Sequence, residues 1–361
     1  MRIAYLCTDR GIALGGHKGA SVHMAEVVSA LARAGAEVLL LPARIADRRL
    51  ELPESVIVDP LPAAATDVAL ADWLEERMAE FGAGAVYERL ALHSAAGATA
   101  AGRLGIPHVV EMNAPLPLEA ARYRTLDRPD EAARLERVVL TGADVVLVVS
   151  EELGRYARRQ GATRVEVSPN AVDMRKFPAP SRVGEARCVF VGALRPWHGV
   201  ETLVQGWRVL GREAPSLLVV GDGPERAALE AIGAEVTGAV PHAEVPGLLA
   251  TASIGLAPYA GDAPGYFSPL KLFEYLAAGL AVVAGSISGV REVVGPEHAV
   301  LVPPGDPAAL ATAVAGLAAD EARRTRLGAA GREHVAAHHT WDQRARRILA
   351  LVEPVHAGAA A

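Results

Sequence analysis

The sequence contains few of the features that mark disulfide-rich, metal-binding or membrane proteins. Its 361 residues include only two cysteines, Cys7 and Cys188, and both lie in short apolar runs typical of buried strands. A disulfide framework or a thiolate metal site is therefore not expected, and no spacing of His, Cys or carboxylate residues predicts a dedicated metal site. We interpret the two thiols as core residues of a protein in a reducing compartment.

Long apolar runs and a strong charge of one sign are missing as well. No stretch of about 18 uncharged apolar residues occurs, and the start "MRIAYLCTDRG" is interrupted too early for a signal peptide. These features favour a soluble, cytoplasmic protein. The chain has 36 Lys plus Arg against 42 Asp plus Glu, a net charge of −6, which argues against a nucleic-acid partner. A local basic pocket for phosphate remains compatible with that balance.

What the sequence does contain is a regular alternation of short β-rich runs with helix-period segments. These runs are "RIAYLC", "AEVLLLPA", "AVYERL", "PHVVEM", "ADVVLVVS" and "RVEVSP" in the first half, and "RCVFVGA", "SLLVVGDG", "AEVTGAV", "SIGLAPY", "LAVVAGS" and "AVLVPPG" in the second. The alternation predicts an α/β fold with two Rossmann-like, doubly wound domains of parallel strands facing a cleft. The Pro-rich stretch 177–184 marks the linker, so we expect domains at 1–176 and 177–340. An amphipathic helix, "WDQRARRILALVEPV", follows before a short tail.

The first turn that could carry chemistry is "GGHKGASVHM", residues 15–24. Gly15 and Gly16 permit positive φ and close backbone approach, and the following helix would aim its free N–H groups at an anion. Lys18 could add charge there, although a surface loop with a solvated lysine has the same pattern. Neither G-x-G-x-x-G nor a closing G-K-[ST] is present, which excludes the dinucleotide fingerprint and the P-loop.

Two further turns follow strands in the second half. In "LLVVGDGPE", Gly221 and Gly223 allow a sharp bend beneath a ligand, and Pro224 suits a first helical turn. By itself this is a common strand-to-helix turn. Thr237 and Gly238 end a short strand whose backbone could pair with the edge of a nucleobase, and an ordinary strand end explains them equally well.

The stretch "SPLKLFEYLAAG" places a lysine in a helix's first turn. Ser268 is predicted as the N-cap and Pro269 as the first helical residue, which puts Lys271 and Glu274 on one face. A lysine there opposes the helix dipole by up to about 1 kcal/mol, so a bound anion such as a diphosphate would explain it. Glu274 could then accept hydrogen bonds from a ribose. The alternative is a plain Lys–Glu surface pair.

Taken together, these motifs resemble the retaining glycosyltransferases of family 4, which have the GT-B architecture. The resemblance rests on "KGASVH", "VSPNAVD", "FVGALRPWHGVETLV", "LLVVGDGPE", "SPLKLFEYLAAGLAVVAG" and "VLVPPGDPAALATAV" in that order. It implies a nucleotide-sugar donor (a UDP-, GDP- or dTDP-sugar) held mainly by the C-terminal domain. It also implies an acceptor held mainly by the N-terminal domain, a final segment 341–361 that crosses back to the N-terminal domain, and no required cofactor.

The resemblance also implies roles for single residues. Gly16 matches the loop glycine that faces the donor diphosphate, Glu274 the ribose-binding glutamate, and the turns at 221–224 and 237–238 the nucleotide contacts. The chain departs from the family where a sugar-binding glutamate, a basic pair and an N-terminal histidine are usual. Those positions hold Tyr266, Ala193 with His198, and Asn113.

Departure of a nucleoside diphosphate still needs positive charge. We therefore expect Lys271 and Arg195 as catalytic residues that supply this charge. Asn113, at the position of the family's histidine, is the third expected catalytic residue, and His198 and the helix start at Ser268, Pro269 and Leu270 are expected beside the phosphates.

The acceptor is a hydroxyl compound of open class: a glycan, a lipid-linked intermediate or a natural product. Candidate acceptor-binding residues follow two N-terminal strands and are Arg89, Glu111, Arg122 and Arg124. An arginine cluster at 155–164 could touch anionic lipid weakly, or could be a solvated helix face. Two alternatives to transfer stay open: a sugar-nucleotide epimerase of the same architecture, and a nucleotide-sugar-binding protein with weak or no catalysis.

Overall fold

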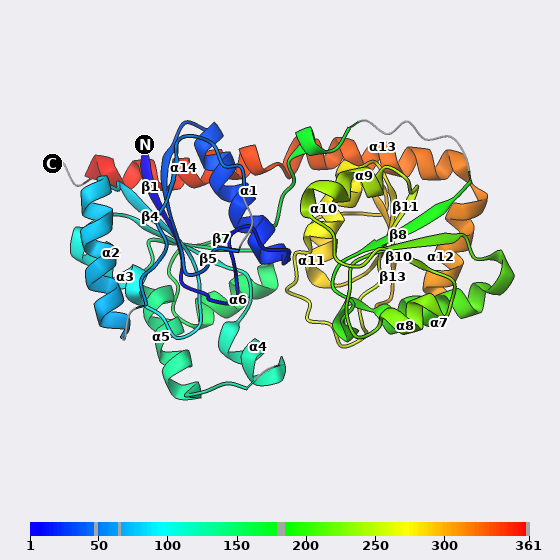
Figure 1. Ribbon diagram of the computed structural model, residues 1–361, viewed down its shortest axis with the longest axis horizontal. Helices are drawn as coiled ribbons and strands as arrows, with labels where there is room; N and C mark the ends of the chain where they lie inside the picture. The colour runs from blue at the N-terminus through cyan, green and yellow to red at the C-terminus, as the bar shows by residue number, and fades with distance from the viewer. Residues whose placement is uncertain (47–49, 64–65, 124, 179–184, 359–361) are drawn as a thin grey trace. The chain divides into compact units, whose positions relative to one another are not determined.

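The chain divides into two compact units, each described here separately. A computed structural model describes residues 1–46, 50–63, 66–123, 125–178 and 185–358. Unit 1 comprises Met1–Pro169 together with Trp341–Ala361, and unit 2 comprises Asn170–Thr340 (Figure 1). The first boundary thus lies seven residues before the one predicted at 176/177, and 179–184 of the expected linker lie outside the described residues.

Hydrogen bonds explain why the boundary precedes the Pro-rich stretch. The N–H of Asn170 donates to Ser268 Oγ at 2.9 Å, and the N–H of Val172 donates to the His339 carbonyl at 3.0 Å. Arg332 Nη2 donates to the Phe177 carbonyl at 3.0 Å. These contacts hold 170–177 to unit 2, whereas composition alone marks only where a chain turns easily.

Unit 1 contains a seven-stranded parallel sheet in the order β3-β2-β1-β4-β5-β6-β7. Most residues of its central strands are buried and apolar, which is why the sequence shows short apolar runs there. The short edge strand β3 is the one strand of this sheet that the sequence pattern did not predict. The strands are β1 (Arg2–Cys7), β2 (Glu37–Pro42), β3 (Val56–Val58), β4 (Ala85–Arg89), β5 (His108–Met112), β6 (Val145–Val148) and β7 (Val165–Val167).

Helices cover the sheet of unit 1. Helices α2 and α3 pack on the face formed by Ala4, Leu6 and Leu39, and α14 lies alongside α1 (Figure 1). Helix α14 extends three residues beyond the predicted helix, to Gly358, and the end of the expected tail, 359–361, lies outside the described residues. The helices are α1 (Gly19–Arg33), α2 (Asp67–Phe81), α3 (Ala96–Leu104), α4 (Leu116–Tyr123), α5 (Pro129–Gly142), α6 (Glu151–Arg159) and α14 (Trp341–Gly358).

Unit 2 contains a six-stranded parallel sheet in the order β10-β9-β8-β11-β12-β13. All six strands coincide with the apolar runs of the second half. They are β8 (Arg187–Val191), β9 (Ser216–Val220), β10 (Glu235–Val236), β11 (Ile254–Ala257), β12 (Ala281–Gly285) and β13 (Ala299–Val302).

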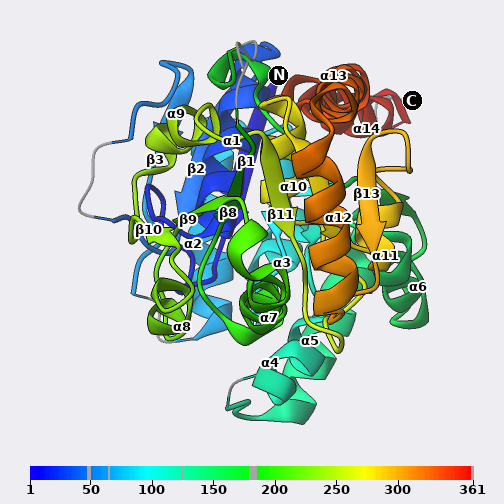
Figure 2. The same ribbon diagram turned by 90° about the vertical axis from the view of Figure 1, so that its right-hand side faces the viewer.

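Both faces of the second sheet are also covered. Helices α7 and α12 pack side by side on one face (Figure 2), and α9, α10 and α13 contribute to the apolar cluster on the other. The helices are η1 (Met174–Lys176), η2 (Pro196–His198), α7 (Val200–Leu210), η3 (Gly211–Glu213), α8 (Arg226–Glu230), η4 (His242–Glu244), α9 (Val245–Leu249), α10 (Leu270–Ala277), α11 (Ser288–Arg291), α12 (Pro307–Ala319) and α13 (Glu321–His338).

The predicted fold class is confirmed, because each unit is a parallel sheet flanked by helices, the arrangement of doubly wound α/β domains. In such sheets, ligands bind at the carboxyl ends of the strands. Across the described ranges, no helix combines the length and apolar character needed to cross a membrane.

Candidate functional site

Lys271 is a buried cation in the first turn of α10. The residue is 9% exposed, and its Nζ has no hydrogen-bond partner within the described part of the chain. The ammonium lies 4.1 Å from the centre of the Phe190 ring, an interaction that offsets only part of its lost hydration. Burial lowers the pKa of Lys271 to about 7, although Glu274 opposes that shift. An unpaired buried ammonium is costly unless an anion joins it.

The loop between β8 and α7 lies directly against this lysine. Gly192, at φ 143°, leaves so little room that an added Cβ would lie 2.9 Å from Lys271 Nζ. His198 Nδ1 is 2.7 Å from the Ala193 carbonyl, so Nδ1 carries the proton and Nε2 can only accept. Burial and the nearby Lys271 lower the pKa of His198 to about 3, which keeps it neutral. Arg195 is exposed, with its guanidinium over the Trp197 ring.

The glycine turns predicted to hold a nucleotide lie next to that loop. Gly221 and Gly223 adopt φ of 151° and 156°, and a Cβ on Gly221 would lie 2.0 Å from the Gly192 carbonyl oxygen. Gly238 forms an antiparallel bridge with Gly221, and the Thr237 N–H donates to the Val219 carbonyl at 3.0 Å. The structure therefore brings three predicted segments together: the loop at 192–198, the turn at 221–224 and the strand end at 237–238. Pro224 precedes α8, which begins at Arg226.

The start of α10 differs from the prediction by one residue. Pro269 is the cap residue, and the helix begins at Leu270 with no side-chain cap and no acidic residue in its first turn. Ser268 is therefore not the N-cap. Its hydroxyl accepts the Asn170 N–H, and its carbonyl accepts a hydrogen bond from Asn170 Nδ2. The cap residue Pro269 has no acceptor atom in its side chain, so no cap side chain binds the first N–H groups of α10.

Glu274 lies one turn beyond Lys271 and is 7% exposed. Its Oε1 is 2.6 Å from His242 Nε2, which comes from the short η4 segment. A histidine therefore holds the carboxylate that the resemblance assigns to the ribose. Tyr266, which stands where the family carries a second glutamate, is 8% exposed and packs edge-on against Phe267.

The predicted glycine loop of unit 1 precedes α1. Gly15 adopts φ 74°, and a Cβ on Gly16 would lie 2.9 Å from both the Ala13 carbonyl oxygen and Ser21 Oγ. Lys18 Nζ donates to the Gly11 carbonyl at 2.8 Å, so in this structure the ammonium binds the loop that precedes α1. Helix α1 has no side-chain cap and no acid in its first turn. A helix start without a cap side chain suits an anion.

The acceptor residues predicted from the sequence lie in two places. Glu111 is fully buried and accepts hydrogen bonds from Arg89 and Asn113, so this part of the prediction falls on an internal network. Arg122 lies on α4 with its guanidinium over the Tyr123 ring. Arg124 lies outside the described residues.

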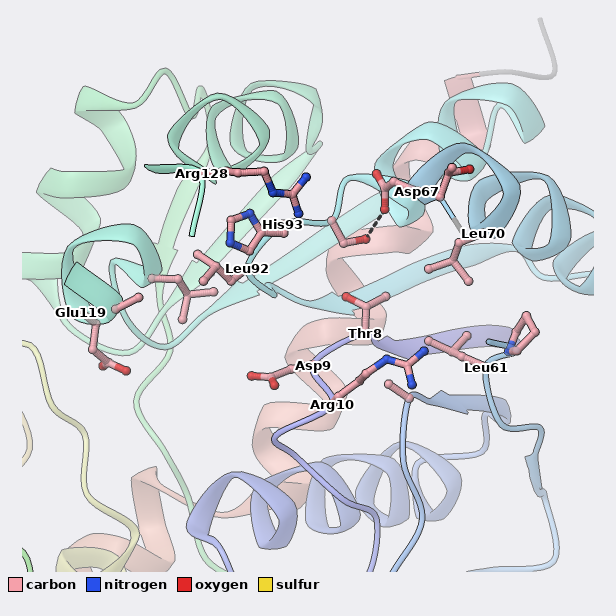
Figure 3. A pocket seen from close by; sticks show the side chains of 16 residues that line it. Thr8, Asp9, Arg10, Leu61, Asp67, Leu70, Leu92, His93, Glu119 and Arg128 are labelled. Atoms are coloured by element: carbon pink, nitrogen blue, oxygen red, sulfur yellow. Dashed lines mark hydrogen bonds between the residues drawn. The ribbon is translucent and has the colours of Figure 1, made fainter. Parts of the chain in front are cut away.

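A pocket of about 540 Å³ opens at the carboxyl ends of the strands of unit 1. Figure 3 shows Arg128 and His93 on one side, facing Thr8, Asp9 and Arg10 on the other. Its polar groups are interleaved with apolar ones. The remaining lining residues are Ala43, Leu61, Pro62, Thr66, Asp67, Leu70, Leu92, Ser94, Leu116, Glu119 and Ala120.

Two features of the pocket concern its backbone. Asp67 accepts hydrogen bonds from Ser94 Oγ at 2.7 Å and from the Ala95 N–H at 2.8 Å, which anchors the turn before α3. His93 adopts φ 63°, a conformation that is uncommon for a residue with a Cβ. Asp9, Arg10 and Arg128 were not predicted as site residues. The signal for Asp9 and Arg10 was their position directly after β1.

Known protein families match both parts of the chain. The model described as Glycosyltransferase Family 4 matches residues 17–176, and the model described as Glycosyl transferases group 1 matches residues 185–320. The two matches fall in units 1 and 2 respectively, apart from the last residues of the first.

Curated relatives and a solved structure agree with these models. A GDP-mannose-dependent alpha-(1-6)-phosphatidylinositol monomannoside mannosyltransferase from Mycobacterium tuberculosis is 31% identical over 57% of this chain, which spans 61% of that relative. A 2-deoxystreptamine glucosyltransferase from Streptomyces kanamyceticus is 30% identical over 67% of this chain and 69% of that protein. Sucrose-phosphate synthase from Thermosynechococcus elongatus aligns over 99% of both chains with a TM-score of 0.78 and 21% identity, which shows the shared GT-B fold. On this evidence the chain belongs to the glycosyltransferases of family 4.

Proposed function

We propose that the protein transfers a sugar from a nucleoside-diphosphate sugar to a hydroxyl group of an acceptor, with retention of the anomeric configuration. The observation that carries the proposal is the unpaired, buried ammonium of Lys271. A cation without a hydrogen-bond partner destabilises the protein on its own, and a diphosphate would satisfy it.

The surroundings of Lys271 suit a diphosphate. The first turn of α10 presents N–H groups without a capping side chain, and Gly192, Gly221 and Gly223 let the backbone approach closely. Arg195 is exposed on the same loop and can add a second positive charge. Because His198 is neutral and its Nε2 is an acceptor, its role in this proposal is to receive a hydrogen bond from the donor rather than to supply charge.

The nucleoside end of the donor is assigned to the neighbouring carboxylate and strand end. Glu274, held by His242 at 2.6 Å, can accept hydrogen bonds from both ribose hydroxyls. The backbone at Thr237 and Gly238 is assigned to the base. Tyr266 in place of a glutamate removes a charged carboxylate acceptor for the transferred sugar, which favours a sugar with fewer hydroxyl contacts on that side.

The acceptor is assigned to the pocket of unit 1. Its carboxylates, guanidinium groups and histidine can bind hydroxyl or amino groups, and its leucines can contact the apolar faces of a ring. The matched relatives act on a 2-deoxystreptamine and on a phosphatidylinositol monomannoside, one small and soluble and one lipid-linked. A pocket of about 540 Å³ favours an acceptor group about as large as one or two rings.

The proposed reaction needs no strong protein nucleophile. The bond between the anomeric carbon and the diphosphate oxygen breaks, and the acceptor oxygen bonds to that carbon on the same face. The acceptor proton passes to an oxygen of the leaving phosphate. Lys271 and Arg195 stabilise the negative charge that develops on the diphosphate, where low dielectric makes such charges most effective.

The test is transfer of labelled sugar by the full-length chain. UDP-glucose, UDP-N-acetylglucosamine, GDP-mannose, dTDP-glucose and ADP-glucose are each offered with 2-deoxystreptamine or with phosphatidylinositol monomannoside in vesicles. We expect a glycoside and nucleoside diphosphate in equal amounts, with the donor's anomeric configuration in the product by NMR. Sugar isomerisation without an acceptor would instead establish an epimerase, and saturable donor binding without turnover would establish a binding protein.

A further inference from the structure

Glu111, at the carboxyl end of β5, is the centre of a buried hydrogen-bond network in unit 1. Its side chain is fully buried, and its two oxygens accept five hydrogen bonds. Arg89 Nη1 at 2.8 Å and Asn113 Nδ2 at 2.5 Å donate to Oε1. His23 Nε2 at 2.7 Å, Arg344 Nη2 at 2.9 Å and the Tyr87 hydroxyl donate to Oε2.

The network fixes the orientation of the Asn113 amide. Burial alone raises the pKa of Glu111, but His23, Arg344 and Arg89 hold it well below its usual range, so the carboxylate is ionised. An ionised carboxylate can only accept hydrogen bonds, so the amide must face it with Nδ2. Asn113 Oδ1 therefore lies on the opposite side of the amide, where it can accept a hydrogen bond from another group.

Arg344 connects this network to the C-terminal helix. It projects from α14, and while Nη2 bonds Glu111, Nη1 donates to the carbonyls of Ser168 and Pro169 at 3.2 and 2.8 Å. Those two residues end the first segment of unit 1. A single guanidinium thus ties α14, the segment after β7 and the carboxylate of β5 together.

Stability alone does not account for the network. The Tyr5 hydroxyl and Arg344 Nε are buried and have no hydrogen-bond partner in the part of the chain that the structure describes. Buried ionic networks that leave such groups unsatisfied are commonly less stable than apolar packing of the same volume. Asn113, in contrast, is only partly buried, so the network ends at an accessible side chain.

We propose that Glu111 and Arg344 are positioning residues for sugar transfer: Arg344 holds Glu111, and Glu111 holds Asn113 with Oδ1 turned toward the reacting groups. The inference rests on the proposed function, because the resemblance to family 4 is what assigns Asn113 to the reacting carbon. Where relatives use a histidine, this chain presents an amide oxygen, which accepts a hydrogen bond from a substrate hydroxyl.

A double-mutant cycle tests the link from Glu111 to Asn113. Glu111→Gln keeps the size of the side chain and removes its charge, and Asn113→Ala removes the proposed contact. We expect Glu111→Gln to lower kcat by about 10- to 100-fold with the donor KM changed less than about twofold. In the Asn113→Ala background, the same substitution should lower kcat by less than about twofold. Fully additive losses would overturn the proposal.

The Arg344 link has a matched control on the same helix. Arg344→Lys keeps the charge but cannot reach both Glu111 and the two carbonyls, and we expect a kcat loss that is again absent in the Asn113→Ala background. Arg347, also on α14, pairs with Glu166 on the surface. Arg347→Lys should leave kcat within about twofold. Equal losses in the two variants would contradict a specific role for Arg344.

A second measurement does not depend on activity. The chain contains two asparagines, Asn113 and Asn170, so selective ¹⁵N-Asn labelling yields two side-chain amide signals. In Glu111→Gln we expect a shifted and faster-exchanging Asn113 signal, whereas Asn170, bound to Ser268, keeps its signal and reports an intact unit 2. An unchanged Asn113 signal in Glu111→Gln would overturn the positioning role, and this result does not require that sugar transfer be detected. A changed Asn113 signal with full transferase activity would overturn it as well.

Discussion

At the scale of single residues, Lys271 combines a cost to stability with a proposed gain in catalysis. Its ammonium is buried and unpaired within the described residues, beside Gly192 and Phe190. We expect Lys271→Met to lower sugar transfer by more than about tenfold, or about 1.4 kcal/mol in the barrier, because the leaving diphosphate loses its buried charge. The measurement is the steady-state rate of sugar transfer from whichever of the five nucleotide sugars the protein uses.

The same substitution should leave the protein at least as stable. Because burial lowers the pKa of Lys271 from 10.5 to about 7, the unfolded chain binds more protons between these values, and the free energy of unfolding rises with pH across that window. The Lys271→Met variant should lack this contribution to the slope. Lys176→Met, at an exposed lysine of the same unit, is the control and should change neither stability nor turnover. A loss of transfer below about tenfold in Lys271→Met would remove the leaving-group role.

The lowered pKa of Lys271 also predicts how donor binding depends on pH. An anionic diphosphate favours the protonated lysine, so above about pH 7 binding must take up a proton. The dissociation constant of a nucleotide sugar, whose diphosphate does not titrate in this range, should be constant below about pH 6.5. Above about pH 7 it should rise toward about tenfold per unit. Calorimetry at about pH 8 in two buffers of different ionisation enthalpy measures the proton uptake, and Lys271→Met should show none.

At the scale of elements, the starts of α1 and α10 lack a side-chain cap, as do those of α3, α8, α9 and α11. Thr66, Ser150 and Asp306 cap α2, α6 and α12 through their side chains. Neither α1 nor α10 has such a cap or an acid in its first turn. In α10 the reason is visible, since the cap residue is Pro269, whose side chain has no hydrogen-bond acceptor. In α10 these N–H groups lie at the turn that carries Lys271, where the proposed function places the donor diphosphate.

The turn after β9 provides a test at the same scale. Gly221 and Gly233 both have positive φ, 151° and 81°, but only Gly221 lies against backbone, with an added Cβ 2.0 Å from the Gly192 carbonyl oxygen. A Cβ on Gly233 meets nothing within 4 Å. We expect Gly233→Ala to cost about 1 kcal/mol and leave donor affinity unchanged. Gly221→Ala should cost more and displace the loop beside Lys271.

Thermal unfolding and donor titration separate the two glycine variants. The expected outcome is a larger loss of melting temperature in Gly221→Ala, together with donor binding weakened by at least about tenfold. Equal affinities in the two variants would show that the loop at 192–199 does not shape the donor site.

At the scale of the whole molecule, the chain returns to its first unit after completing the second. Trp341–Ala361 belongs to unit 1, where Ala345, Ile348, Leu351 and Val352 of α14 are buried. The amphipathic pattern of this segment predicts a helix with one buried face. The resemblance to family 4 supplied the expectation that it packs on the N-terminal domain. The packing of α14 also places Arg344 where it donates a hydrogen bond to Glu111.

Much of the architecture was predictable because parallel strands are buried on both faces and read as short apolar runs. Twelve such runs predicted twelve of the strands, and the family resemblance predicted the GT-B fold. The edge strand β3, Val56–Val58, was missed, although it matches the predicted strand β7 in length and partial exposure. The unit boundary was misplaced because the hydrogen bonds of Asn170, Val172 and Phe177, rather than composition, assign that stretch.

The sequence by itself determined the two sheets, the glycine turns and the identity of Lys271 as an unusual helix residue, because periodicity and backbone requirements are local properties. Only the tertiary structure decided which charges have partners. Lys18, Glu111 and Arg89 were predicted to contact a ligand. In the structure Lys18 donates to the Gly11 carbonyl, and Arg89 donates to Glu111. Lys271, in contrast, is buried without a hydrogen-bond partner among the described residues. Hydrogen bonding and burial depend on residues that are distant in the chain, and a single sequence does not encode those distances in any local pattern.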